Sequence, residues 1–225
     1  EITDLAYKYS KDNADELVFY DISASTKNEV VETAWVKKVA DKINIPFCVA
    51  GGIKNIRVAE AILNLGADKI SINTPAIENP KLITELAKEF GSQCVVVGID
   101  SYFQDQQYNV YSRTGDPTTR TKSNRLTYSW IKEVQDRGAG EIVLNCMNQD
   151  GVRNGYDLKQ LFDARKISRV PLIASGGAGN MDHFYDVFNS CNVDGALAAS
   201  VFHKNDVGIE VLKNNLLNRG IRVRR

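Results

Sequence analysis

The sequence predicts an α/β protein, a (β/α)8 barrel built from two half-barrel repeats. Short apolar runs alternate with segments of helical periodicity, as in a parallel sheet with helical crossovers. The stretch 45–53, IPFCVAGGI, returns 125 residues later within 170–179, VPLIASGGAG. One proline and two glycines are shared, namely Pro46, Gly51 and Gly52 against Pro171, Gly176 and Gly177. Two halves that close into one barrel explain this repeat.

The composition fits one domain over residues 1–225. Of the 225 residues, 43% are hydrophobic, which is enough for a core of this size. The 28 Lys and Arg residues balance 28 Asp and Glu residues, so no net field attracts nucleic acid or an anionic membrane. Any anion site must therefore be local.

The cysteines and the chain ends bear on location. None of the four cysteines has CxxC spacing, which favours a reduced, cytoplasmic protein. No membrane span or signal peptide is recognisable. The chain starts at Glu1 rather than at methionine, so we expect that its natural beginning is absent.

The first half is expected to begin with a helix, because Ile2, Leu5, Ala6 and Tyr9 have helical spacing. Helical periodicity also covers Thr33–Ile43, Val58–Leu65 before a capping Gly66, and Pro80–Phe90 before Gly91. The strands expected between them are Leu17–Tyr20 (ending at Asp21), Phe47–Ala50, Lys69–Asn73 and Cys94–Ile99.

The polar segment 101–124 interrupts this alternation. Tyr108, Val110 and Tyr111 alternate with polar residues, and Gly115, Asp116 and Pro117 form a turn signal. We expect a long loop with a small hairpin, and loops of this length are commonly functional lids.

The second half resumes the alternation. Helices are expected at Tyr128–Arg137, Leu158–Ala164, Met181–Phe188 and Ile209–Leu217, and strands at Ile142–Cys146, Leu172–Ser175 and Gly195–Ala199. The expected parallel strands are one short of a barrel. An open doubly wound sheet is the alternative, but it does not explain the repeat.

Glycine turns between a strand and a helix suit phosphate, because backbone N–H groups and the helix dipole favour an anion there. In a barrel, such turns lie at the carboxyl ends of the strands, where active sites form. The first half offers Gly51, Gly52, Asn73 and Thr74; the second offers Asp150, Gly151, Gly176, Gly177, Ala199 and Ser200. Two sites imply a substrate phosphorylated at both ends. Alternatively, the glycines only permit close packing.

Asp100 is the candidate general acid or base, because it ends the buried run 95–99. A cap for the next segment is the alternative role. The repeat places a mate of Asp100 upstream of residue 1, on the strand that the barrel lacks.

Six stretches together resemble a known family: DELVFYDISAS (15–25), FCVAGGI (47–53), GADKISINTPAIENP (66–80), VVVGID (95–100), GAGEIVLNCMNQDGVRNGYD (138–157) and ASGGAG…GALAASVFHK (174–204). They resemble the cyclase subunits of imidazole glycerol phosphate synthase, of histidine biosynthesis. The resemblance covers essentially the whole chain.

The resemblance implies a reaction. Ammonia from a separate glutaminase subunit reacts with a bisphosphorylated aminoimidazole carboxamide ribonucleotide whose sugar is open. The products are imidazole glycerol phosphate and an aminoimidazole carboxamide ribonucleotide. The partners implied are this glutaminase, in a heterodimer, and the substrate.

The resemblance also implies roles for residues. Asp100 matches one of two catalytic aspartates. Gly52, Asn73 and Thr74 match one phosphate site, and Asp150, Gly151, Gly176, Gly177, Ala199 and Ser200 match the other. The first strand, with the second aspartate and a lysine-bearing loop, is not in this sequence; we expect the natural protein to carry it.

Charged residues are expected near the amino ends of the strands. Alternation along the strands turns Lys69, Glu16 and Glu141 inward. A structural salt bridge is one interpretation. The other, which the resemblance supports, is a gate on an ammonia passage from the glutaminase, with Asp68 placed to meet that partner.

Two other functions remain open: the sister isomerase of the same pathway, and a catalytically silent barrel that activates a glutaminase. His183 and His203 are expected in surface or supporting roles, since neither has metal-ligand spacing. No cofactor motif and no metal motif is present in the sequence.

Overall fold

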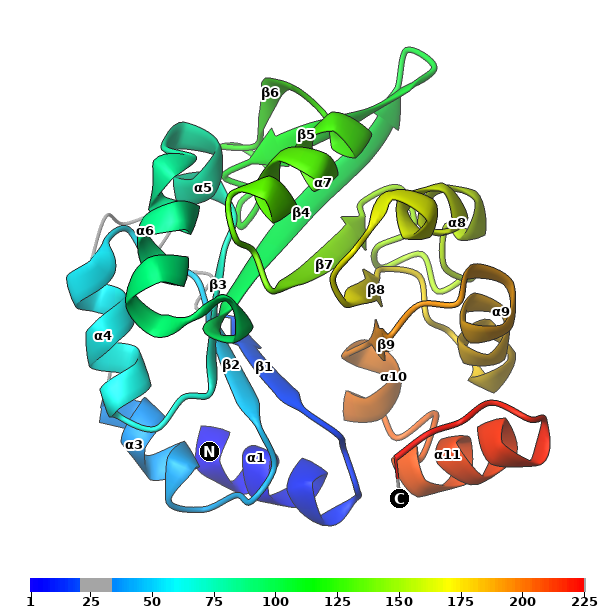
Figure 1. Ribbon diagram of the computed structural model, residues 1–225. Helices are drawn as coiled ribbons and strands as arrows, with labels where there is room; N and C mark the ends of the chain where they lie inside the picture. The colour runs from blue at the N-terminus through cyan, green and yellow to red at the C-terminus, as the bar shows by residue number, and fades with distance from the viewer. Residues whose placement is uncertain (21–33, 225) are drawn as a thin grey trace. The chain divides into compact units, whose positions relative to one another are not determined.

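The computed structural model of this chain describes residues 1–20 and 34–224 (Figure 1). The chain divides into two compact units. The first comprises Glu1–Val97, Ser112–Thr121 and Arg137–Gly140, and the second Gly98–Tyr111, Lys122–Asp136 and Glu141–Arg225. The expected strand end at Asp21, the helix start at Thr33 and part 21–25 of the resemblance lie outside the described residues.

The first unit alternates parallel strands with helices. Its elements are α1 (Ile2–Lys11), β1 (Leu17–Tyr20), α3 (Ala34–Ala40), β2 (Phe47–Ala50), α4 (Ile56–Asn64), β3 (Lys69–Ile72), α5 (Thr74–Glu78), α6 (Lys81–Phe90), η1 (Ser92–Cys94) and the start of β4 (Val95–Gln104). The strand order is β1-β2-β3-β4. Leu17 lies opposite Phe47, and Ile70 lies opposite Val95.

The core of the first unit lies between this sheet and its helices. All four residues of β2 are buried, as expected for a strand that is covered on both faces. Helices α3, α4 and α6 line the sheet (Figure 1). Their buried residues recur at helical spacing: Val36 and Val39, Ala59 and Ile62, and Leu82, Ile83 and Leu86.

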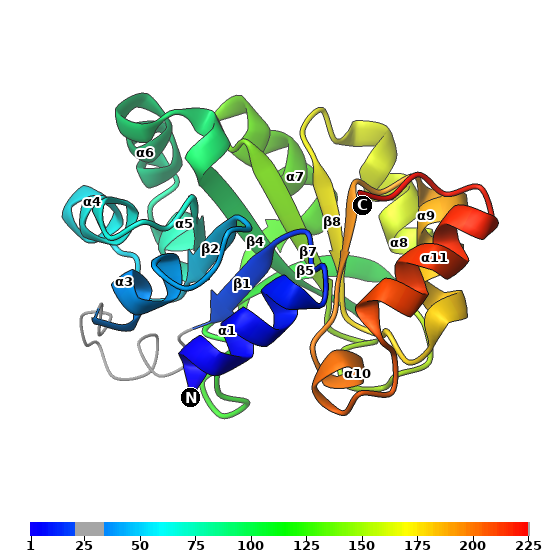
Figure 2. The ribbon, with the colours of Figure 1, turned by 90° about the horizontal axis from the view of Figure 1, so that it is seen from below.

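The second unit repeats the alternation. It contains the later part of β4, then β5 (Gln107–Ser112), β6 (Thr121–Leu126), α7 (Thr127–Asp136), β7 (Glu141–Cys146), α8 (Leu158–Ile167), β8 (Leu172–Ser175), α9 (Met181–Cys191), β9 (Gly195–Leu197), α10 (Ser200–His203) and α11 (Ile209–Asn218). Strand β8 pairs in parallel with β7 and with β9. Helix α9 packs against α8 and α11 (Figure 2). This alternation in both units is the arrangement of a (β/α)8 barrel, as the sequence predicts.

The two units share element bounds and one backbone contact. Strands β2 and β8 match residue for residue at the separation of 125, as do the first residues of α4 and α9. At the start of β2, the Asp68 carboxylate accepts the N–H of Phe47 at 2.9 Å. At the start of β8, the Asp194 carboxylate accepts the N–H of Leu172 at the same distance. The repeat in the sequence is therefore a repeat in structure.

The segment 101–124 differs from the expected loop. Strand β4 does not end at Asp100 but continues to Gln104, turns at Asp105 and Gln106, and pairs with β5 in antiparallel register. Strand β6 then pairs with β5. The predicted hairpin is thus confirmed, but the long loop around it is wrong, because aromatic residues of the two strands pack across the pair, as Tyr102 does on Tyr111 and Phe103 on Tyr108.

Several predicted boundaries are also corrected. Helix α4 begins before Val58 because the Asn55 side chain caps it, accepting the N–H of Val58 at 3.1 Å. Strand β9 ends at Leu197, so Ala199 does not belong to a strand. The structure adds two short helices that the sequence pattern does not predict, α5 and α10.

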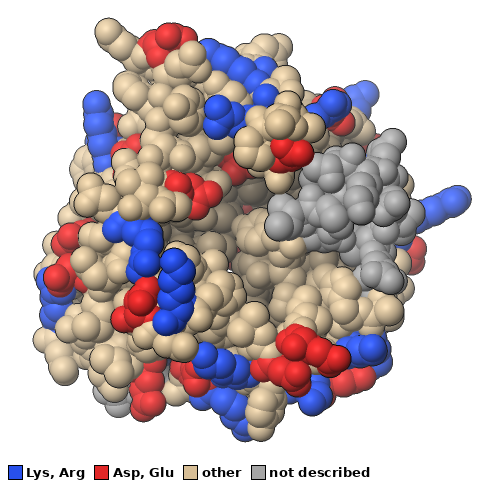
Figure 3. Space-filling model, turned by 180° about the vertical axis from the view of Figure 1, so that it is seen from behind, with Lys and Arg blue, Asp and Glu red and all other residues tan. Residues whose placement is uncertain are grey.

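Positive and negative side chains are interspersed on the surface that Figure 3 shows, in line with the balanced composition. The four cysteines are free. Among the described residues, no helix is both long and apolar enough to span a membrane.

Candidate functional site

The glycine turns after β2 and β8 each hold two successive glycines at positive φ. The φ angles are +102° at Gly51 and +91° at Gly176, and +67° at Gly52 and +111° at Gly177. Positive φ strongly favours glycine, so the shared residues follow from a shared turn. Each turn leads into a helix that is capped by an asparagine, Asn55 for α4 and Asn180 for α9. Both units thus present a glycine turn followed by a helix start, where backbone N–H groups favour anions.

Close packing also requires a glycine in the second turn. A Cβ on Gly177 would lie 2.1 Å from the carbonyl oxygen of Gly155, and the N–H of Gly155 donates to the carbonyl of Gly177 at 2.8 Å. Here the close approach is between two loops, rather than between a helix and a strand. The packing interpretation therefore holds for Gly177. This role is compatible with anion binding by the backbone N–H groups of the same turn.

The hydroxyl residues of both units lie at the starts of short helices. Asn73 precedes α5 and Thr74 is its first residue, while Ala199 precedes α10 and Ser200 is its first residue. The Thr74 hydroxyl oxygen accepts the N–H of Arg113 at 2.9 Å. The hydroxyl hydrogen of Thr74 is not used in that bond. Each unit thus adds a hydroxyl after the strand that follows its glycine turn.

Asp150 and Gly151 lie in the turn after β7. The N–H of Asp150 donates to the carbonyl of Cys146 at 3.1 Å. A Cβ on Gly176 would lie 3.4 Å from that same nitrogen, so the fold brings Asp150 and Gly176 together. Gly151 is exposed and has a φ of +76°. The turn is held to β4 by Asn148, whose side chain accepts the N–H of Phe103 at 2.7 Å and donates to its carbonyl at 3.3 Å.

Asp100 lies within β4, where the pairing with the antiparallel β5 begins. The Asn145 side chain on β7 donates a hydrogen bond from Nδ2 to Oδ1 of Asp100 at 2.8 Å. Because Asp100 is followed by strand, its alternative role as a cap for the next segment is wrong. Asn145 is not among the site residues that the sequence predicts, although the alternation that turns Glu141 inward also turns Asn145 inward, two pleats further along β7.

Lys69 and Glu16 form an ion pair in the first unit. The Lys69 Nζ lies 2.7 Å from Oε2 of Glu16, and the exposed fractions of the side chains are 21% and 28%. The partial burial makes this pair less screened by solvent than a surface pair. Glu141 begins β7 in the second unit. The structure therefore shows the contact between Lys69 and Glu16. That Glu141 joins them in one charged layer stays a prediction.

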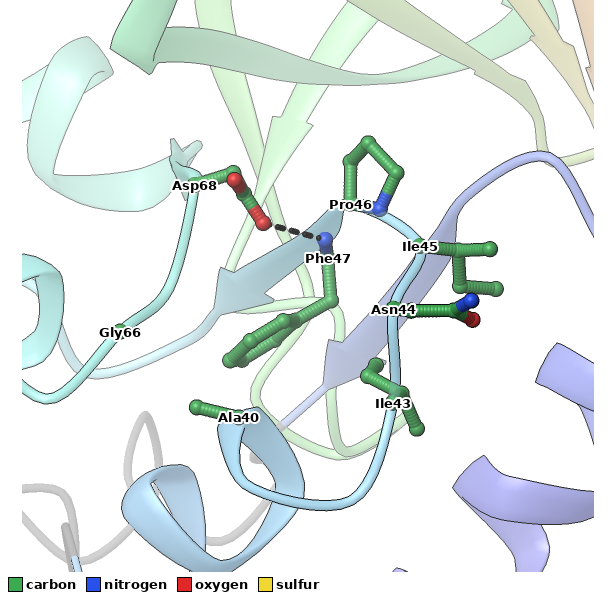
Figure 4. Close-up of a pocket in the computed structure, with 8 residues that line it drawn as sticks. All are labelled: Ala40, Ile43, Asn44, Ile45, Pro46, Phe47, Gly66 and Asp68. Atoms are coloured by element: carbon green, nitrogen blue, oxygen red, sulfur yellow. Dashed lines mark hydrogen bonds between the residues drawn. The ribbon is translucent and has the colours of Figure 1, made fainter.

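A pocket of about 280 Å³ lies at the amino-terminal end of β2 and β3, with Asp68 on its wall (Figure 4). Its other lining residues are Ala40, Ile43, Asn44, Ile45, Pro46, Phe47 and Gly66. Asp68 is exposed, and its Oδ2 accepts the N–H of Phe47. In the second unit, the matching Asp194 also pairs with the Arg165 guanidinium at 2.5 Å. Ala40 stands at the position that matches Arg165, so the pocket lies where the second unit has an arginine.

Shifted pKa values do not point to a further acid or base. Burial, and then the charge of Asp157, raises the pKa of Tyr108, whose hydroxyl donates to Asp157 at 3.2 Å. Burial also raises the pKa of Cys146 and of Tyr156. These groups stay protonated near neutral pH. In the described ranges, no group of three or more His, Cys, Asp and Glu side chains could hold a metal ion.

Comparisons with known proteins cover the whole chain. A family model described as "Histidine biosynthesis protein" matches residues 1–208. The imidazole glycerol phosphate synthase subunit HisF of Vibrio cholerae is 60% identical over 227 residues, which cover 100% of this chain and 88% of the relative. The proteins of the same name from Aliivibrio fischeri (over 228 residues) and Photobacterium profundum (over 227 residues) are also 60% identical, with the same shares covered.

Proposed function

Because the chain belongs to the histidine biosynthesis protein family, we propose that it is the cyclase subunit of an imidazole glycerol phosphate synthase. Relatives that are 60% identical along the whole chain carry that name. The observation that carries the proposal is the duplicated glycine turn, with positive φ at both glycines and an asparagine helix cap in each unit. A substrate with a phosphate at each end needs one such anion site for each phosphate.

The proposed reaction joins ammonia to the open-sugar aminoimidazole carboxamide ribonucleotide bisphosphate. It yields imidazole glycerol phosphate and an aminoimidazole carboxamide ribonucleotide. Asp100 acts in it as a general acid–base group, because proton transfers accompany both carbon–nitrogen bond formation and cleavage. The hydrogen bond from Asn145 supports this role, since it fixes the direction in which the carboxylate points.

The phosphates are assigned to backbone amides and hydroxyls rather than to a basic patch. The first-unit site comprises Gly52, Asn73 and Thr74. The second-unit site comprises Asp150, Gly151, Gly176, Gly177, Ala199 and Ser200. Local sites of this kind agree with the absence of net charge.

The partner is proposed to be a glutaminase subunit, in a heterodimer, that supplies ammonia. Asp68 supports a docking role at the pocket of Figure 4, because its mate Asp194 already pairs with an arginine of the chain, whereas Ala40 leaves that place open. A lysine or arginine of the partner fits such an acidic pocket. Lys69, Glu16 and Glu141 are assigned to the gate of the ammonia passage. We expect the complex to work in the cytoplasm, and we expect this chain to be one barrel domain over residues 1–225.

The test is an assay of the native protein with the open-sugar bisphosphate and an ammonium salt, followed by the loss of the substrate's absorbance. Turnover by the wild type and its loss in Asp100→Asn are expected. No turnover by a folded wild-type protein that still activates a glutaminase would instead support a silent barrel. Turnover of the closed-sugar precursor to its open form would support the sister isomerase.

A further inference from the structure

His183 makes an unusual contact with the second glycine turn. The N–H of Gly179 donates to Nδ1 of His183 at 3.0 Å. His183 lies in the first turn of α9, and its own N–H donates to the capping Asn180 at 3.2 Å. An imidazole nitrogen that accepts a hydrogen bond carries no proton, so the neutral ring has its proton on Nε2. The side chain thus accepts a backbone N–H of the turn before the helix, in addition to the helix cap that Asn180 provides.

The repeat indicates that this contact is not needed to build a strand, a glycine turn and a helix. In the first unit, Asn55 caps α4 as Asn180 caps α9. At the separation of 125, Val58 stands at the position of His183 and Lys54 at the position of Gly179. The first unit therefore builds a similar turn with a valine, which has no hydrogen-bond acceptor, at the position of the imidazole. The imidazole therefore serves something that only the second turn requires.

The His183 ring also lies where two loops of the second unit meet. A Cβ on Gly155 would lie 3.6 Å from Cδ2 of the ring, so Gly155 packs against the imidazole. The N–H of Gly155 also donates a hydrogen bond to the carbonyl of Gly177. The loop that carries Asp150 therefore contacts the His183 ring through Gly155, and the turn that carries Gly177 contacts it through Gly179.

We propose that His183 is a positioning residue for the phosphate monoester that binds the second glycine turn. The proposal rests on the proposed function of that site. Nδ1 holds the N–H of Gly179 away from the anion and fixes the turn, so that the amides of Gly176 and Gly177 are presented in one orientation. The ring, packed on Gly155, keeps the loop of Asp150 and Gly151 in place beside the turn. No proton transfer to substrate is assigned to the imidazole.

Two substitutions separate this role from a merely structural one. His183→Val introduces the residue that the first unit has at this position, so the protein is expected to fold, with a melting temperature lowered by no more than roughly 4 °C. His183→Asn keeps a carbonyl oxygen that can accept the N–H of Gly179. Loss of one hydrogen bond predicts a KM for the bisphosphate that is about three- to tenfold higher in His183→Val. The value of kcat should fall less than KM rises, and His183→Asn should restore most of the affinity.

Binding of inorganic phosphate provides a readout without turnover. In an NMR titration of the native protein, the Kd should rise in His183→Val and recover in His183→Asn, and imidazole ¹⁵N shifts in alkaline buffer should show the proton on Nε2. Equal Kd values for the three proteins, no recovery in His183→Asn, or a proton on Nδ1 would each overturn the proposal. If the wild type binds phosphate as expected but turns over no substrate, the proposed function fails while the role of His183 stands.

Discussion

The Nδ2 of Asn145 donates a hydrogen bond of 2.8 Å to Oδ1 of Asp100, joining β7 to the proposed acid–base residue on β4. Asn145 is half-buried, and its own carbonyl oxygen accepts the Ser175 hydroxyl at 3.4 Å. The amide therefore has a defined orientation, with its donor end towards the carboxylate. Substitution of Asn145 therefore tests the surroundings of Asp100 most directly.

Asn145→Asp replaces the donated hydrogen bond with a second carboxylate. Two neighbouring carboxylates lose their protons in two steps, and their repulsion raises the pKa of the second step by about one unit or more. The acid limb of the kcat profile should shift to higher pH, because Asp100 then stays protonated to a higher pH. Asn145→Ala is the control, since it removes the hydrogen bond without adding charge. A pH profile that is the same for both variants would contradict the assignment.

Lys69→Ala tests the ammonia gate. The variant loses the ion pair with Glu16, which joins two partly exposed side chains and so contributes only about 1 kcal/mol or less to stability. Turnover driven by glutamine through the partner should fall more than turnover driven by free ammonium. The two rates are measured on the same complex. Equal losses in both would remove the gate and leave a structural salt bridge.

Asp68→Asn and Ala40→Arg test the docking pocket. The amide of Asp68→Asn can still accept the N–H of Phe47, so the fold should be kept while the negative charge is lost. Partner affinity, measured by titration calorimetry, should fall roughly tenfold, as expected for loss of a charge-assisted hydrogen bond. Ala40→Arg copies Arg165 of the second unit and should fill the pocket from within, so it too should weaken the complex.

Asp194→Asn is the matched control for this pair. Its carboxylate has the same backbone contact but pairs with Arg165 of the chain. Little change in partner affinity is expected for it. A drop as large as that of Asp68→Asn would show that the effect comes from the strand start rather than from the pocket.

Tyr156→Phe predicts a change in alkaline stability. The Tyr156 hydroxyl donates to the carbonyl of Leu197 at 3.1 Å, the residue is only 6% exposed, and burial raises its pKa. A raised pKa means that the folded state keeps its proton while the unfolded state loses it, so stability falls as pH rises above the ordinary tyrosine value. The variant should cost roughly 1 kcal/mol at neutral pH. Its stability should then decline less steeply in alkali, as measured by urea unfolding at several pH values.

Much of the fold follows from local patterns. Strands Leu17–Tyr20, Phe47–Ala50 and Leu172–Ser175 have the predicted bounds, because short apolar runs between turn residues leave little freedom. For the segment after Asp100, the sequence predicts the hairpin but a loop around it, since a mostly polar segment does not by itself reveal a partner strand. Helices α5 and α10 are too short to show periodicity.

The sequence alone determined the half-length repeat, the two glycine turns, the acidic residue at the strand of Asp100 and the family that these stretches resemble. It did so because a required φ, a helix cap and a buried apolar run each restrict the residue type at their own position. Only the tertiary structure decided which side chains meet. Asn145 on Asp100, His183 on Gly179 and Ala40 in place of an arginine beside Asp68 depend on contacts between separate elements. The distances that make such contacts arise only when strands and helices pack, and no local pattern encodes them.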